Sequence, residues 1–293
     1  MHRIDTSTAQ VDKFGAGKNG FTGGNPQTGE LPTALDADFF DSIQEEIAGV
    51  IEAAGLTLSK SNNSQLLASI NKLVGSGRLL SVKAISSSGT YTPSSGAKLL
   101  YVECIGGGGG GGGLLAPGSS GHSVTGGGGG GGYASSMITS VAASYSVSVG
   151  TAGAGGTAGN PGGNGGSTSF GTACVASGGG GGNANTTTES TTSAIVSAAG
   201  IPGVGTTGNI VISAGERGEP GIGTANGNLG GAGGSSRAGR GGVRVGASAG
   251  NASNGSAGLG YGCGGSGAAA AATTNGAVGG AGTSGIVIIW EYA

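Results

Sequence analysis

Hydrophobic and polar positions repeat with different periods along the chain, and the first clear period is helical. After Asp36, apolar residues recur at intervals of three and four until Gly55, at Phe39, Phe40, Ile43, Ile47, Val50, Ile51 and Ala54. This spacing predicts an amphipathic helix with Asp36 as its cap and Gly55 as its stop. A second stripe predicts a helix capped by Asn62 or Asn63 and ended by Gly75, with Leu66, Leu67, Ile70, Leu73 and Val74 on one side. Two short helices bury little surface alone, so we expect a small helical oligomer or docking onto a larger body.

From Leu79 the pattern changes to that of strands. Residues 79–85 and 98–105 have the composition of strands, and the turn-forming residues 86–95 separate them. The most strand-like run comes after Gly285, where residues 286–292 read Ile-Val-Ile-Ile-Trp-Glu-Tyr. These runs bracket a glycine-rich region, and we predict that they pair with one another and close it.

Between the strands, glycine recurs at every third residue. The longest array runs from Gly150 to Gly165 without a miss, another runs from Gly276 to Gly285, and shorter arrays start at Gly215 and Gly227. Three residues per turn is the period of the polyproline II conformation, whose backbone groups must find partners outside their own helix. The blocks are short, change phase and contain little proline, which disfavours a collagen-like triple helix.

The remaining solution is to fold one chain back and forth, so that short polyglycine II helices lie side by side and bond backbone to backbone. A helix enclosed on all sides has no room for side chains. We therefore expect a central layer made of Gly106–Gly113, Gly126–Gly132 and Gly178–Gly182, with the arrays from Gly150, Gly227 and Gly276 outside it. The predicted fold is a polyglycine II sandwich bracketed by a few β-strands, preceded by a small α-helical region.

Composition changes this picture in two ways. With 74 glycines and 9% charged residues, we expect that an ordinary hydrophobic core cannot be built. Nine of the fourteen acidic residues lie in the first 52 positions, so two regions with different roles are expected. The predicted parts are an extended attachment arm (1–32), a helical attachment or oligomerisation region (33–77), a linker with opening strands (78–105) and a glycine-rich head (106–293) closed by strand 286–292.

The charge balance and the cysteines limit the partners. A net charge of −2 and no basic cluster disfavour nucleic acid as a partner. Cys104, Cys174 and Cys263 are odd in number and widely spaced, which indicates buried reduced thiols and no metal site. No signal peptide or membrane-spanning run is evident, so we expect a protein made in a cytoplasm and carried out of the cell only by a particle.

Several motifs resemble phage tail fibres. Gly-Thr-Tyr-Thr-Pro (89–93), Lys-Leu-Leu-Tyr-Val-Glu-Cys-Ile-Gly-Gly-Gly-Gly (98–109) and the final Gly-Ile-Val-Ile-Ile-Trp-Glu-Tyr resemble the strands of glycine-rich C-terminal domains of bacteriophage tail fibres. The glycine blocks resemble those of the T-even-type phage tail-fibre adhesin, whose fold is a polyglycine II sandwich. The stretch from His2-Arg-Ile-Asp to Phe39-Phe-Asp is similar to the attachment end of tail-fibre proteins of temperate phages and prophages. The T-even adhesin has no such attachment end, so its stoichiometry does not transfer.

The sequence offers little for catalysis. Gly15-x-Gly17-x-x-Gly20 matches a dinucleotide fingerprint, but no strand precedes it and no helix comes after it, so chance explains it. Glu216 and Glu219 have the spacing of a carboxylate pair, although solvated charge around Arg217 is the simpler interpretation. We predict a protein that is not an enzyme and has no cofactor.

Binding fits the breaks in the glycine pattern better, because recognition residues lie on loops held by a rigid scaffold. The breaks are residues 114–124, 133–149, 183–195, 237–244, 261–263 and 268–275, and alternate breaks should emerge at the same end. The candidate receptor-binding residues are Leu114, Leu115, His122, Tyr133, Tyr145, Arg237, Arg240 and Tyr261. For the aromatic residues Tyr133, Tyr145, Phe170 and Tyr261, packing under the layers is an equal alternative.

The resulting hypothesis is a virion tail-fibre protein with no nucleic-acid partner and no membrane insertion. Its N-terminus would attach to phage baseplate or tail proteins, and its loops would bind a bacterial outer-membrane protein or surface polysaccharide. A homo-oligomer is expected, with a trimer favoured over a monomer. Two alternatives stay open, a structural glycine-rich fibre or coat protein without specific recognition and, third, a surface depolymerase.

Overall fold

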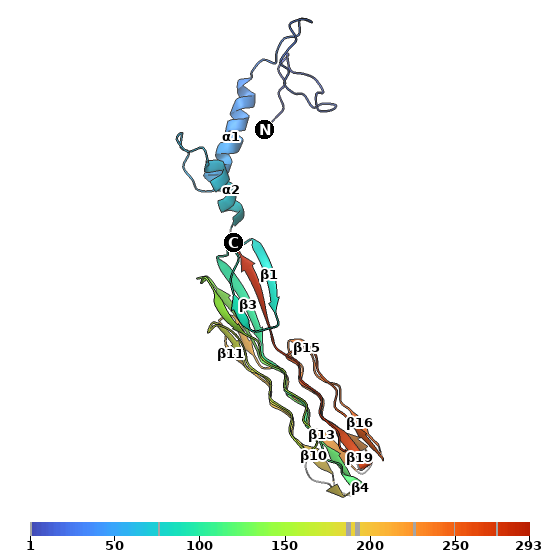
Figure 1. Cartoon of the computed structure of the whole chain (residues 1–293). Helices are drawn as coiled ribbons and strands as arrows, with labels where there is room; N and C mark the ends of the chain where they lie inside the picture. The colour runs from blue at the N-terminus through green and yellow to red at the C-terminus, as the bar shows by residue number, and fades with distance from the viewer. Residues whose placement is uncertain are drawn as a thin grey trace. The chain divides into compact units, whose positions relative to one another are not determined.

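The computed structural model describes residues 2–75, 77–185, 189–190, 194–224, 227–248, 250–273 and 275–293. Contacts divide the chain into two compact units, Met1–Arg78 and Leu79–Ala293. The first unit contains two helices, and the second contains strands in several small antiparallel sheets joined by glycine-rich segments (Figure 1).

The helices of the first unit match the predicted stripes. Helix α1 spans Ala37–Ala53, and the side chain of Asp36 caps it by accepting a hydrogen bond from the Asp38 N–H. Gly55 ends it in the left-handed conformation, with φ at 67°. Helix α2 spans Gln65–Gly75. The cap predicted at Asn62 or Asn63 is wrong by one or two residues, because Asn62 forms a local turn with Ser64 and the helix starts after it.

The N-terminal arm is not extended, contrary to the prediction. Antiparallel bridges join Gln10 to Gly20 and Asn25 to Glu30, so residues 2–32 form two closed loops. Ile4 is buried, and Phe21 packs edge-on against Phe39 of α1. The glycine and proline residues of this segment therefore form turns that fold it onto the first turn of the helix.

In the second unit the bracketing strands pair as predicted. One five-stranded sheet has the order β1-β20-β3-β5-β12, and β20 pairs antiparallel with both β1 and β3. A second five-stranded sheet has the order β11-β8-β7-β6-β2. The strands of the first sheet are β1 (Leu79–Ile85), β20 (Ile286–Tyr292), β3 (Leu99–Ile105), β5 (Tyr133–Ile138) and β12 (Val211–Ser213). Those of the second are β11 (Gly205–Thr207), β8 (Cys174–Ala176), β7 (Thr168–Phe170), β6 (Tyr145–Ser148) and β2 (Gly89–Tyr91).

These two sheets enclose a hydrophobic core, which the composition had led us not to expect. Phe170 is its largest fully buried side chain, and it stacks on Tyr145 with 4.4 Å between ring centroids. The buried members of the core are Tyr91, Leu100, Val102, Cys104, Ala134, Val147, Phe170, Cys174, Ala176, Val287 and Ile289. The few large apolar residues of the unit are concentrated at this end, which we call the sandwich end.

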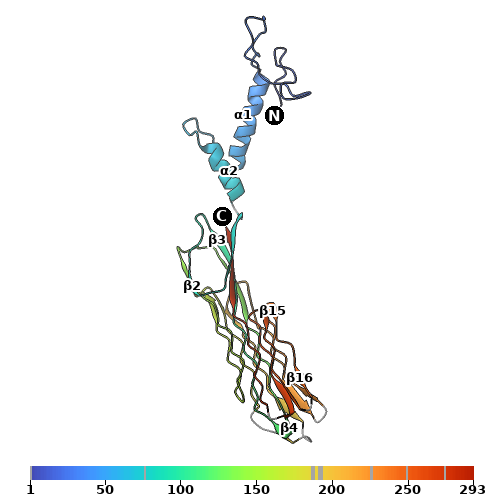
Figure 2. The ribbon, with the colours of Figure 1, turned by 45° about the vertical axis from the view of Figure 1, so that its right-hand side comes forward.

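Two four-stranded sheets lie at the opposite end of the unit, which we call the tip (Figure 2). The first has the order β10-β13-β14-β16 and the second β17-β19-β4-β9, while β15 and β18 form a separate pair. The strands are β10 (Ile195–Ser197), β13 (Gly221–Thr224), β14 (Gly227–Leu229), β16 (Gly246–Ala247), β17 (Asn251–Ser253), β19 (Ala269–Thr273), β4 (Gly118–Val124), β9 (Glu189–Ser190), β15 (Ala238–Arg240) and β18 (Leu259–Tyr261).

Glycine-rich segments connect the two ends and form what we call the glycine bundle. The backbone N–H groups of residues 106–114 donate in turn to three antiparallel segments. Every third residue from Gly106 bonds to 126–132, every third residue from Gly107 bonds to 160–166, and every third residue from Gly108 bonds to 277–283. The carbonyl groups of 107–112 accept from three further segments, 153–156, 179–182 and 265–268. A segment with six bonded neighbours satisfies its backbone on every side.

This arrangement explains the requirement for glycine. A Cβ atom placed at Gly108, Gly110 or Gly111 would lie 1.9–2.0 Å from a carbonyl oxygen of a neighbouring segment. Every residue of 106–113 and 126–132 is buried. Two of the three predicted central runs are therefore enclosed.

The third predicted central run is a correction. Gly178, Gly180 and Gly181 are only half-buried, so 178–182 lies toward the surface of the bundle. The third enclosed segment is instead 262–270, where Cys263 and Ser266 interrupt the glycines and all residues are buried. The outer arrays are where we expected them: Gly150, Gly153 and Gly156 are buried, and the residues between them are mostly exposed.

Candidate functional site

The turns between glycine segments are divided between the two ends of the second unit. Leu114 bridges Asn185 and Ala277, and His122 pairs with Ala271 and Glu189, which brings the breaks 114–124, 183–195 and 268–275 together at the tip. Residues 186–188, 191–193 and 274 of these breaks lie outside the described residues. The break 133–149 starts in β5, paired to β3 at the sandwich end. The first three breaks alternate between the two ends as expected, but 268–275, the sixth break, lies at the tip with the first and third, so the expectation that alternate breaks share an end is wrong for the last part of the chain.

Burial then removes two tip candidates from the exposed surface. Leu114 is fully buried in a small cluster with Ala268, Ala270 and Ala277, and His122 is 2% exposed. Leu115 is 45% exposed and is the tip candidate that a partner can reach as the chain is folded. Leu114 and His122 hold the tip sheets in place and do not line its surface.

The other candidates lie away from the tip. Tyr133 is buried opposite Ile105 and donates a hydrogen bond of 2.6 Å to Glu103. Burial and this carboxylate raise the pKa of Tyr133 above its usual range, so the phenol stays protonated. The guanidinium of the exposed Arg237 lies 4.4 Å from the centroid of the Tyr133 ring.

Tyr145 is half-buried on Phe170, so it and Tyr133 agree with the packing alternative. Tyr261 and Arg240 stay exposed on the paired strands β18 and β15. The eight candidates therefore do not form one site.

Sequence reasoning missed an exposed apolar row on a tip sheet. Val196 in β10, Ile222 in β13 and Leu229 in β14 are direct cross-strand partners, so they lie side by side on one face. They are 70%, 40% and 42% exposed. A Cβ at Gly223, on the opposite face of β13, would lie 3.0 Å from the His122 ring, so that face packs inward. Ile222 and Leu229 each stand alone among small or polar neighbours in the sequence, Val196 follows only Ile195, and strand register alone brings the three together.

The buried ionisable groups at the sandwich end are structural. Glu291 accepts hydrogen bonds from the Tyr91 hydroxyl at 2.5 Å and the Ser94 N–H at 2.8 Å. Burial raises the pKa of Glu291, but the hydrogen bonds from Ser94 and Tyr91 outweigh it and the net shift is downward. The three cysteines are free and buried, as predicted. Contact with Cys174 and burial raise the pKa of Cys104, which therefore stays a thiol.

Glu216 and Glu219 are exposed, as the interpretation as solvated charge predicted. The cation that pairs with Glu219 is Arg244, which lies just before β16, and not Arg217. In the part of the chain that the structure describes, no helix is long and apolar enough to cross a bilayer.

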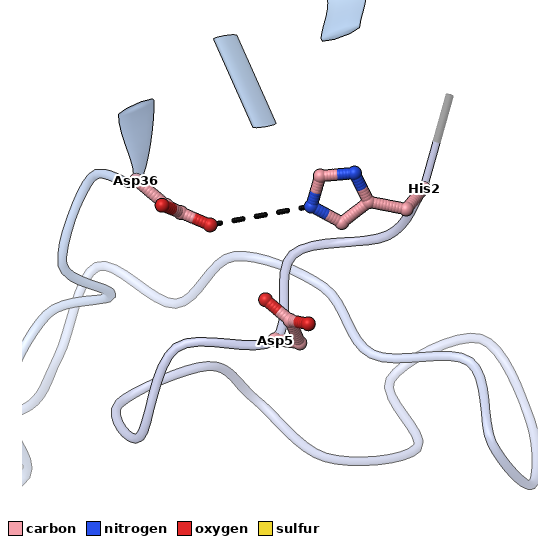
Figure 3. A group of neighbouring side chains, drawn as sticks. All are labelled: His2, Asp5 and Asp36. Carbon is pink, nitrogen blue, oxygen red and sulfur yellow. Dashed lines mark ion pairs between the residues drawn. The ribbon is translucent and has the colours of Figure 1, made fainter. Parts of the chain in front are cut away.

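One group of side chains in the first unit has the chemistry of metal ligands. His2, Asp5 and Asp36 each offer one ligand atom, and these three atoms lie within 4.8 Å of one another (Figure 3). The His2 Nε2 to Asp36 Oδ2 distance is 4.0 Å.

Comparison with known proteins identifies the family of the second unit. Residues 84–292 match the family described as glycine-rich domain. The chain belongs to the glycine-rich domain family. The matched residues of this glycine-rich domain protein include both five-stranded sheets, the glycine bundle and the tip, apart from the first residues of β1.

A further similarity covers a shorter part of the chain. Over 74 residues it is 61% identical to "Uncharacterized protein StfP" of Escherichia coli (strain K12). The match covers 25% of this glycine-rich domain protein and 35% of StfP, so the chain spans about a third of the length of that relative.

Proposed function

We propose that this protein is a tail-fibre receptor-binding protein of a phage or prophage, carried on the virion, and that its tip binds a bacterial surface receptor without catalysing a reaction. The carrying observation is the exposed row Val196, Ile222 and Leu229 at the tip. Aliphatic side chains held side by side on a sheet gain binding energy when a partner buries them. Leu115 adds a further exposed apolar side chain at the same end.

The rigidity of the bundle supports the same proposal. We infer that its segments are polyglycine II helices, because the hydrogen bonds rotate among three neighbours with a period of three residues. Such a framework fixes the tip without a large hydrophobic core. Binding then loses little conformational entropy, which favours recognition by complementary shape.

Of the two receptor classes, the tip favours an outer-membrane protein. The described residues of its segments 114–124, 157–161, 183–197, 221–229, 243–254 and 268–278 include no Phe, Tyr or Trp. Sugar hydroxyls placed against aliphatic side chains would lose their hydrogen bonds to water, which costs binding free energy. An apolar protein surface makes no such hydrogen bonds and therefore avoids this cost. Loss of binding when the polysaccharide alone is removed would instead identify a surface polysaccharide as the receptor.

The first unit is proposed to attach the fibre and to form a homo-oligomer, with three copies favoured. Its helices expose apolar side chains at Phe40, Ile47, Leu67, Ile70, Leu73 and Val74. These exposed residues are what an amphipathic helix covers when it packs against a partner. The partners would be further copies of this chain and the baseplate or tail proteins, and many copies on one particle would strengthen weak single contacts.

The experiment compares binding of the labelled full-length chain to a panel of bacterial strains. We expect Val196→Ser, Ile222→Ser and Leu229→Ser in combination to reduce binding by at least about tenfold, because each removes an exposed apolar contact. Leu259→Ser, at an exposed position away from the tip, is the matched control and should bind normally. Protease treatment of the cells should abolish binding, and removal of surface polysaccharide should not.

Unchanged binding of the triple variant on a strain that binds the wild type would show that the row is not the contact surface. Loss of binding after polysaccharide removal alone would assign the receptor to the other class.

A further inference from the structure

The group His2, Asp5 and Asp36 combines residues that are close to one another only in the fold. Figure 3 shows the imidazole of His2 directed toward the carboxylate of Asp36, and the Asp5 carboxylate lies near both of them. His2 and Asp5 belong to the first loop, and Asp36 is the cap of α1. The three ligand atoms lie within 4.8 Å of one another.

The backbone around the group is held by contacts outside it. Ile4, between His2 and Asp5, is 2% exposed, which anchors the first residues. The Thr6 hydroxyl donates to the Ala34 carbonyl, and the Ala34 N–H donates to the Thr8 hydroxyl at 2.6 Å. These bonds join the first loop to the residues that lead into Asp36.

The ligand side chains are also oriented. One oxygen of Asp36 accepts the Asp38 N–H at 3.3 Å, which leaves the other oxygen, Oδ2, toward His2. The His2 ring packs edge-on against Phe39, with 5.9 Å between centroids. Across the described residues, the Asp5 carboxylate has neither a hydrogen-bond nor an ion-pair partner, although a second carboxylate lies beside it.

We propose that His2, Asp5 and Asp36 bind a divalent transition-metal ion of the Zn²⁺ class. One imidazole nitrogen and two carboxylate oxygens suit such an ion, whereas Ca²⁺ and Mg²⁺ prefer oxygen ligands alone. Bonds of about 2.0–2.2 Å require the three atoms to approach one another, and the exposed His2 and Asp5 side chains can rotate to do so. Three protein ligands leave the fourth tetrahedral position open to water or to a group of a partner.

The ion would join residues 2–5 to the first turn of α1. Because binding to the folded form alone stabilises it, the metal would hold the N-terminal loop against the helix. The metal would therefore have a structural role in the unit proposed to attach the fibre. This proposal does not depend on the proposed receptor recognition by the tip.

The test uses the full-length chain, stripped of metal with a chelator and titrated with Zn²⁺ by calorimetry and with Co²⁺ by visible absorption. We expect about one ion per chain, the absorption of four-coordinate Co²⁺ with nitrogen and oxygen ligands, and slower proteolysis within residues 2–36 once Zn²⁺ is bound. His2→Gln, Asp5→Asn and Asp36→Asn should each weaken Zn²⁺ binding at least about tenfold.

Asp36→Asn tests metal binding without removing the helix cap, because asparagine caps a helix as well as aspartate does but lacks the charge. Asp41→Asn, exposed on α1 and outside the group, is the matched control and should bind Zn²⁺ normally. Two results would overturn the proposal: a wild type that binds no Zn²⁺, or Co²⁺ absorption typical of thiolate ligands that persists in the Asp5→Asn variant, which would place the ion at the cysteines.

Discussion

How strictly a position in the bundle requires glycine depends on the atom nearest to where a Cβ would lie. At Gly110 that atom is the carbonyl oxygen of Ala154, 1.9 Å from where a Cβ would lie. At Gly163 the closest atom would be 3.1 Å away, and at Gly227 nothing lies within 4 Å. The three positions therefore form a graded series of the same substitution.

We predict that Gly110→Ala destabilises the second unit by at least about 3 kcal/mol, because surrounding backbone must move to admit the methyl group. Gly163→Ala should cost less, and Gly227→Ala should be close to neutral. Denaturant unfolding of the three variants measures the order. Equal stabilities for Gly110→Ala and Gly227→Ala would contradict the close packing of the bundle.

Glu291 is the residue whose ionisation should be visible in the stability of the protein. Its pKa lies below the ordinary value of 4.5, so the charged form stabilises the fold above that pH. The contribution disappears as the pH falls through the depressed pKa, where the folded form must also take up the proton. Glu291→Gln keeps the shape but loses the charge-assisted hydrogen bonds from Tyr91 and Ser94.

We therefore expect Glu291→Gln to be less stable than the wild type at pH 7 by on the order of 1 kcal/mol. The difference should shrink steadily below pH 4.5. Unfolding curves of both proteins across this range provide the measurement, with Glu216→Gln, at an exposed position of the same unit, as a control. A difference that does not change with pH would show that the charge of Glu291 contributes nothing.

At the scale of elements, the parts of the chain with a regular period were predictable from the sequence. The stripe after Asp36 and the run after Gly285 correspond closely to α1 and β20. The array from Gly150 lies on the outside of the bundle because its period of three leaves two positions free for side chains. These elements could be predicted because each depends on its own residues.

The remainder depends on neighbours that are distant in the sequence. Segment 262–270 was missed because Cys263 and Ser266 break the glycine run, yet Ser266 accepts a hydrogen bond of 2.7 Å from the Ser256 N–H where the adjacent segment leaves room. The row at Val196 could not be found because it exists only through the register of three strands. His122 looked like an exposed loop residue, but pairing with β19 buries it.

At the scale of the whole molecule, the proposed oligomer depends on the helices and not on the tip. We expect the full-length chain to form an oligomer, most simply a trimer, at micromolar concentration. Leu67→Ser, Ile70→Ser and Leu73→Ser together remove exposed apolar surface from α2 and should dissociate it. Light scattering after size-exclusion chromatography gives the mass directly.

The triple variant at Val196, Ile222 and Leu229 is the matched control, because it should lose binding to cells while keeping the oligomer. A monomeric wild type would contradict oligomerisation through this unit without affecting the proposal for the tip.

The position of β20 between β1 and β3 also determines how the protein folds. Segment 106–113 obtains its six partners from parts of the chain that extend from residue 126 to residue 283, and β20 comes after the last of them. Few of these contacts are local, so little of the bundle can form before most of the chain is present. Folding should accordingly be slow, with loop closure dominating the barrier. For the same reason unfolding requires many distant contacts to break together, and the folded protein should unfold slowly.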